Sequence, residues 1–180
     1  MLDRLIGVFT LKAPVYRAIA DDKSATSTAA IIVVVMSVIG GILAAITTTV
    51  AASLVTDSAQ LAQLGSPVGA AIRAIFNAIL GWLVGSWVFG FVAGLFGGKT
   101  NTSEMLRVFG FTQVFQILNV IPCIGGIAAL VLSVIGAIIG IREAAEFDNT
   151  KAILTGVVGF VILLIVGVVI GIVMGLFGLL

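Results

Sequence analysis

The sequence contains no histidine and only one cysteine in 180 residues. Without histidine there is no His-based metal site and no His-assisted nucleophile. With Cys123 as the sole thiol no disulfide forms within the chain, which leaves only a bridge to another chain open. Most carboxylates, among them Glu104, Glu143, Glu146 and Asp148, lie near Lys or Arg in short connections, where a solvated loop is their usual role. We therefore predict no enzyme, no metal and no cofactor.

Charge is scarce as well. Charged residues make up 9% of the chain and hydrophobic residues 61%, whereas an ordinary soluble domain carries roughly 25% charged residues. Long uncharged stretches between short charged clusters are typical of a chain whose main solvent is lipid. The net charge of +1, with no cluster of Lys and Arg interleaved with aromatic residues, argues against nucleic acid as a partner.

The uncharged stretches predict an all-α, polytopic integral membrane helical bundle with about five transmembrane helices. The stretch 108–141 would be ~51 Å long as one helix and would overshoot a bilayer, so we expect it to fold back. Pro122 and Gly125-Gly126 near its middle favour a tight hairpin, although a re-entrant half-helix would use the same sequence. We expect an N-terminal segment at residues 1–26 and a membrane domain at residues 27–180, with spans at about 29–55, 68–96, 108–121, 124–141 and 152–179.

The first twenty residues have an amphipathic pattern, with Arg4 and Lys12 available to lipid headgroups. We expect a short interfacial helix on the membrane surface, a bend at Pro14 and a further turn leading toward Asp21. The apolar side chains that share its face are Leu2, Leu5, Ile6 and Phe9.

Two polar stretches are predicted to be exposed connections. Residues 57–67 lie between the first two spans, and residues 97–104 lie between the second and third. In the second connection, Thr102 or Ser103 is expected to cap the helix that follows.

The distribution of Lys and Arg predicts the orientation, because positive residues next to spans prefer the cytoplasmic side. The connections on one side of the predicted bundle hold only Arg73, so we expect a cytoplasmic N-terminus and an extracytoplasmic C-terminus. The opposite side holds Arg4, Lys12, Arg17, Lys23, Lys99, Arg107, Arg142 and Lys151.

Glycines recur four residues apart in several spans, a spacing that lets another helix approach closely. We interpret them as packing positions within the chain, with homo-oligomerisation through the last span as the alternative. They are Gly81, Gly85, Gly90, Gly94, Gly136, Gly140, Gly167, Gly171 and Gly175.

Three amide side chains, Gln113, Gln116 and Asn119, cluster in the third span. Polar groups at membrane depth need partners, so we expect interhelical hydrogen bonds or a polar path for a solute. No acidic or basic residue lies within the first, third, fourth or fifth predicted span, which disfavours coupled ion transport.

The order of several short motifs resembles the YIP family, the Ypt/Rab-interacting membrane proteins, in its short prokaryotic form. The motifs are Phe9 and Pro14 before the first span, Leu95-Phe96-Gly97-Gly98-Lys99 after the second, Arg107-Val108-Phe109-Gly110-Phe111 at the third, and Pro122 with Gly125-Gly126.

The resemblance implies five membrane helices, a cytoplasmic N-terminus and a prokaryotic cytoplasmic membrane. For eukaryotic relatives it implies trafficking roles with Rab-type GTPases, but this chain lacks an Asp-Leu-Tyr-Gly-Pro motif, so we do not expect such a GTPase as a partner. The leading hypothesis is a non-enzymatic membrane scaffold or adaptor that binds membrane lipids and either further copies of itself or other membrane proteins. The alternative is a small channel or uncoupled transporter with a path near Gln113, Gln116 and Asn119.

Overall fold

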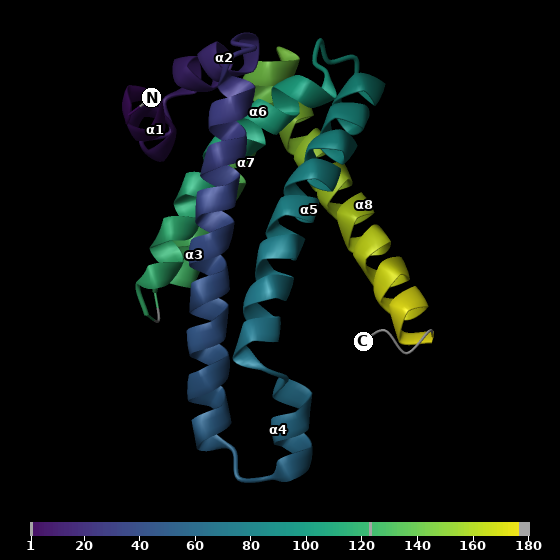
Figure 1. Cartoon of the computed structure of the whole chain (residues 1–180). Helices are drawn as coiled ribbons and strands as arrows, with labels where there is room; N and C mark the ends of the chain where they lie inside the picture. Colours follow the sequence, from purple (N-terminus) through teal and green to yellow (C-terminus); the bar gives the residue numbers. More distant parts are fainter. Residues whose placement is uncertain (1, 123, 177–180) are drawn as a thin grey trace.

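The structure is a computed structural model that describes residues 2–122 and 124–176. Within these residues every regular element is a helix, and the long helices run side by side from one end of the molecule (Figure 1). In chain order the elements are α1 (Leu2–Phe9), α2 (Ala13–Asp21), α3 (Ala25–Leu54), α4 (Ser58–Leu64), α5 (Pro67–Leu95), α6 (Thr102–Thr112), the 3₁₀ helix η1 (Gln113–Val120), α7 (Gly125–Ala145) and α8 (Asn149–Leu176).

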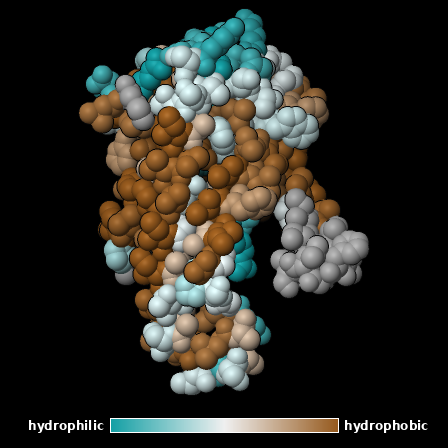
Figure 2. Space-filling model, in the orientation of Figure 1, coloured by the Kyte–Doolittle hydropathy of each residue, from teal (hydrophilic) through white to brown (hydrophobic). Residues whose placement is uncertain are grey.

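The prediction of an all-α membrane bundle is confirmed. Four segments are long and apolar enough to cross a membrane, namely Ala25–Leu54, Ser58–Leu95, Gly125–Ala145 and Asn149–Val169. At ~1.5 Å per residue, α3 and α5 are each ~45 Å long and exceed a hydrocarbon layer of ~30 Å. Figure 2 shows their apolar side chains as a continuous hydrophobic band below a hydrophilic end.

The remaining segment is composite. α6 covers ~16 Å at ~1.5 Å per residue, and η1 adds ~16 Å because a 3₁₀ helix rises ~2.0 Å per residue. Together they form an arm of ~32 Å that packs along α7, which has a similar length. The helix that contains the start of the third predicted span, 108–121, begins earlier, at Thr102.

The fold-back between these two arms depends on Gly125, the first residue of α7. A Cβ atom at this position would collide with the carbonyl oxygen of Leu118. The Gly125 amide donates to the Ile121 carbonyl at 3.1 Å and closes the turn. A side chain would separate η1 from α7, so the close approach requires glycine.

The buried core lies at the end of the bundle that carries the N-terminus. Tyr16, Met105, Phe111 and Ile141 are fully buried there. The hydroxyl of Tyr16 donates to the Val8 carbonyl at 3.2 Å and joins α2 to α1. We call this end the charged cap: it comprises α1, α2 and the connections at residues 22–24, 96–101 and 146–148.

One local prediction is wrong, and the connection 57–67, although exposed as predicted, is partly helical. The connection 57–67 contains a helix, α4, because the Asp57 side chain accepts a hydrogen bond from the Ala59 amide at 2.7 Å and caps it. The cap of α6 is Asn101, not Thr102 or Ser103: its side chain accepts from the Glu104 amide at 3.0 Å. Asn101, the residue just before the expected position, has the extended backbone that capping needs.

Candidate functional site

The three amides predicted as a polar stripe lie in η1, and its geometry aligns them. A 3₁₀ helix has three residues per turn, so side chains at i and i+3 eclipse each other. Gln113, Gln116 and Asn119 are spaced by three and therefore point to one side. In an α-helix the same residues would rotate ~60° apart at each step. All three line one pocket.

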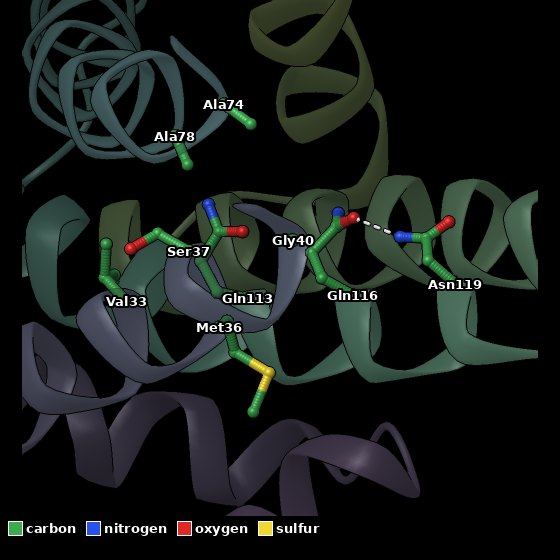
Figure 3. A pocket seen from close by; sticks show the side chains of 9 residues that line it. All are labelled: Val33, Met36, Ser37, Gly40, Ala74, Ala78, Gln113, Gln116 and Asn119. Carbon is green, nitrogen blue, oxygen red and sulfur yellow. Dashed lines mark hydrogen bonds between the residues drawn. The ribbon is translucent and has the colours of Figure 1, made fainter. Parts of the chain in front are cut away.

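The opposite walls of this intramembrane pocket come from α3 and α5. α3 contributes Ser37 and Gly40, and α5 contributes Ala74 and Ala78, whose small size leaves the space open. The amide of Gln113 points toward the α5 side (Figure 3). The pocket has a volume of about 260 Å³, enough for several water molecules.

Two of the amides bond to each other. Asn119 Nδ2 donates to Gln116 Oε1 at 2.7 Å (Figure 3), and Gln116 Nε2 reaches Ser133 Oγ of α7 at 3.5 Å. The side-chain amide of Gln113 makes no hydrogen bond with any residue that the structure describes. Neutral donors and acceptors therefore line the pocket, a chemistry that suits water or an uncharged polar solute.

Tight packing closes the bundle between this pocket and the charged cap. A Cβ atom on Gly110 would lie 2.6 Å from Ala29 Cβ, so α6 and α3 touch through their backbones. Trp82 Nε1 of α5 donates to the Leu106 carbonyl of α6 at 2.9 Å. These contacts fill the space among the three helices, and the pocket ends below them.

Sequence reasoning missed the α3 side of the pocket. Ser37 is a buried serine in the apolar middle of α3, and its hydroxyl donates to the Val34 carbonyl at 2.8 Å. The available signal was the spacing of Ser37 and Gly40, which places a polar and a side-chain-free position on one face of the helix. A single serine in a membrane helix is too common to indicate a site.

Arg17 organises the charged cap. Its Nη2 pairs with Glu146 Oε1 at 2.8 Å, its Nη1 donates to the Glu143 carbonyl at 2.9 Å, and its Nε pairs with Asp21 at 2.9 Å. Lys99 Nζ lies 3.1 Å from the other oxygen of Glu146. Hydrogen bonds from Lys99 and Arg17 hold the pKa of Glu146 below its ordinary 4.5. Glu146 thus connects α2, the α5–α6 connection and the end of α7.

A second group of charges fixes the N-terminal helix. Arg4 pairs with Asp22 at 2.7 Å. Hydrogen bonds from Ser24, then from Arg4, lower the pKa of Asp22 to about 2. With α1 held in this way, Leu2 and Ile6 remain exposed at 69% and 51%. These side chains are available to the outer part of the lipid layer, as expected for an interfacial helix.

The predicted glycine positions fall into two groups. A Cβ placed on Gly136 or Gly140 of α7 would lie 3.0 or 3.5 Å from Tyr16. A Cβ placed on Gly90 of α5 would lie 3.3 Å from the Cα of Thr102. A Cβ placed on Gly85 would lie 4.0 Å from Leu163 of α8. No described neighbour lies within 4 Å of a Cβ placed on Gly81, Gly94 or Gly167, and the surroundings of Gly171 and Gly175 lie outside the described residues.

The chain matches the family model described as the Yip1 domain over residues 6–171. The match begins in α1, spans the charged cap and the intramembrane pocket, and ends in α8. No curated protein and no solved structure matches the chain. Because the family model covers far more than half of the sequence, this integral membrane protein belongs to the Yip1 family.

Proposed function

We propose that this chain is a non-enzymatic membrane scaffold or adaptor that takes part in membrane organisation or trafficking-like processes. The observation that carries the proposal is the uneven packing of the bundle. The core and the ion pairs of the described residues lie in or beside the charged cap, whereas α8 diverges from α3 and α5 beyond it (Figure 1). Membership of a family that is not known as enzymatic supports the same function.

The packing of α8 changes along its length. Near the cap it packs closely, since Gly159 lies against the ring of Phe89 of α5. Farther along, Ile165 and Val168 are 58% and 61% exposed, and no described residue lies within 4 Å of the Cβ position of Gly167. A rigid cap that holds such a helix apart from α3 would present an apolar face to a transmembrane helix of a partner protein.

Site-specific photo-crosslinking in native membranes tests the scaffold function. A photoreactive residue at Ile165 is expected to yield a discrete protein adduct. The matched control is Ile42 on α3, which is 56% exposed and equally apolar, and which should yield mainly lipid adducts. The proposal is wrong if Ile165 gives lipid adducts alone, or if both positions give the same set of protein adducts. An adduct of twice the chain's mass would identify a second copy as the partner.

The proposed orientation places the charged cap in the cytoplasm of a prokaryotic cell. Eight of the nine Lys and Arg residues lie in this cap or beside it. The ninth, Arg73, lies in the second turn of α5, and its guanidinium reaches back toward Gly65 at the opposite end. Nucleic acid and a Rab-type GTPase are not among the proposed partners; lipids, further copies and other membrane proteins are.

A second function, a small channel or an uncoupled transporter, is favoured by the intramembrane pocket. Gln113, Gln116 and Asn119 line it with neutral polar groups. Uptake of urea or glycerol by proteoliposomes would be expected to fall with Asn119→Leu and to persist with Asn77→Leu, an exposed amide outside the pocket. No uptake above that of empty liposomes would exclude this function.

A further inference from the structure

A second pocket lies in the charged cap and differs in chemistry from the intramembrane pocket. It sits where α2 joins α3 and where α6 begins, with a volume of about 460 Å³. Two basic residues, Lys23 and Arg107, and two acidic residues, Asp21 and Glu104, line it together. Both helices that start here, α3 and α6, run from the cap into the apolar band, so the pocket lies at the border between water and lipid.

Arg107 is the unusual member of this cap pocket. It is only 5% exposed, and buried guanidinium groups are normally paired with a carboxylate. Within the part of the chain that the structure describes, Arg107 has no ion pair: its Nε donates to the Ala20 carbonyl at 3.0 Å, and its Nη2 donates to the same oxygen. Its Nη1 donates to no described residue. The geometry leaves one face of a buried cation directed at a pocket.

The acidic residues of the pocket are placed differently. Asp21 already has a partner in Arg17 at 2.9 Å. Glu104 accepts a hydrogen bond from the Asn101 amide at 2.8 Å and forms no ion pair with a described residue. It lies one helical turn before Arg107, a spacing that puts the two Cβ atoms ~5–6 Å apart. One unpaired anion and one unpaired cation therefore line the same pocket, and Lys23 adds a second cation.

We infer that the cap pocket binds the headgroup of an aminophospholipid such as phosphatidylethanolamine. The phosphate lies between Arg107 and Lys23, where a guanidinium and an ammonium both donate. The ammonium lies against Glu104, and a two-carbon chain links it to the phosphate. Basic pockets between membrane helices bind lipid phosphates, and the acidic residue beside this one selects a zwitterion over a purely anionic headgroup. The inference does not depend on the scaffold function.

Binding of defined lipids to the delipidated full chain in mild detergent tests the inference, with native mass spectrometry as the readout. Phosphatidylethanolamine is expected to bind about tenfold more tightly than phosphatidylglycerol with the same acyl chains, because a hydrogen-bonded charge contributes about that factor. Glu104→Gln keeps an acceptor for Asn101 and should abolish the preference. Lys23→Gln should weaken both lipids severalfold, and Lys12→Gln, a lysine outside the pocket, should change neither.

Three results would overturn the inference. The first is equal binding of the two lipids by the unaltered chain, and the second is tighter binding of phosphatidylglycerol. The third is a preference that survives Glu104→Gln. Glycerophosphoethanolamine and inorganic phosphate are added as soluble competitors at millimolar concentration. We expect neither competitor to displace the lipid. Full displacement by either one would show that the cap pocket binds a soluble ligand and not a lipid.

Discussion

Replacing Gly110 with alanine is the most direct test of how the cap side of the bundle is packed. The added Cβ would lie 2.6 Å from Ala29 Cβ, and 3.2 Å from both the Cα and the carbonyl oxygen of Ala29. None of these atoms belongs to a flexible side chain, so no rotamer change relieves the overlap. α6 must move away from α3 or the backbone must distort.

The expected cost follows from two opposing effects. Overpacking a close contact costs about 1–3 kcal/mol, and a rigid backbone neighbour puts Gly110→Ala in the upper part of that range, about 2–3 kcal/mol. Removing a glycine from a helix returns up to ~1 kcal/mol. The variant should therefore be less stable by about 1–2 kcal/mol. Gly81→Ala, where nothing lies within 4 Å, should instead be neutral or more stable by up to ~1 kcal/mol.

Reversible unfolding in mixed micelles of mild detergent and sodium dodecyl sulfate, followed by circular dichroism, would measure both variants. The measured quantity is the difference in free energy of unfolding between Gly110→Ala and Gly81→Ala, expected to be about 1–3 kcal/mol with Gly110→Ala the weaker. Equal stabilities would refute the close approach of α6 and α3. A loss shared by both variants would show instead that alanine is tolerated poorly throughout these helices.

Further predictions concern the pocket, the orientation and the cap. Gln116→Leu removes two side-chain hydrogen bonds and should lower the free energy of unfolding by about 0.5–1.5 kcal/mol, since such bonds in membranes average ~0.6 each; unchanged stability would contradict the bonding in η1. In intact cells, with Cys123 replaced by serine, an impermeant thiol reagent should label Gln60→Cys in the exposed α4 and spare Asn101→Cys, and the reverse pattern would invert the proposed orientation. The cap should weaken as pH falls from about 4.5 through the lowered pKa of Glu146, because protonation removes its pairing with Lys99. Melting curves from pH 7 to 3 should show less of this loss in Glu146→Gln, and equal slopes would assign it to other groups.

Composition was enough to predict the class and most helices of this fold. A chain with 9% charged residues lacks the groups for a water-facing surface, so its uncharged stretches had to become membrane helices. The hairpin at Pro122 and Gly125 was also predictable, because the stretch 108–141 exceeds a membrane thickness. In each case a length or a solvation cost leaves few alternatives.

The conformation of η1 was not predictable, because α and 3₁₀ turns differ little in local sequence preference. Tertiary packing decides between them here. A Cβ on Gly136 of α7 would lie 2.7 Å from the ring of Phe115, which is fully buried in η1. This contact and the turn at Gly125 hold η1 against α7, and the resulting three-residue period brings the amides of Gln113, Gln116 and Asn119 to one pocket.

The ion pairs of the charged cap join residues that are far apart in the chain. Sequence patterns therefore miss them. Arg17 and Glu146 are 129 positions apart, and no helical spacing relates them. Each exposed ion pair contributes little alone, but together they hold the ends of α2, α5 and α7 over a shared apolar core. Beyond the cap the described part of α8 has few neighbours, so its direction depends on its contacts nearer the cap with α7 and with Phe89 of α5. The packing near the cap therefore sets the angle at which α8 leaves the bundle, and with it the width of the apolar surface beside α8.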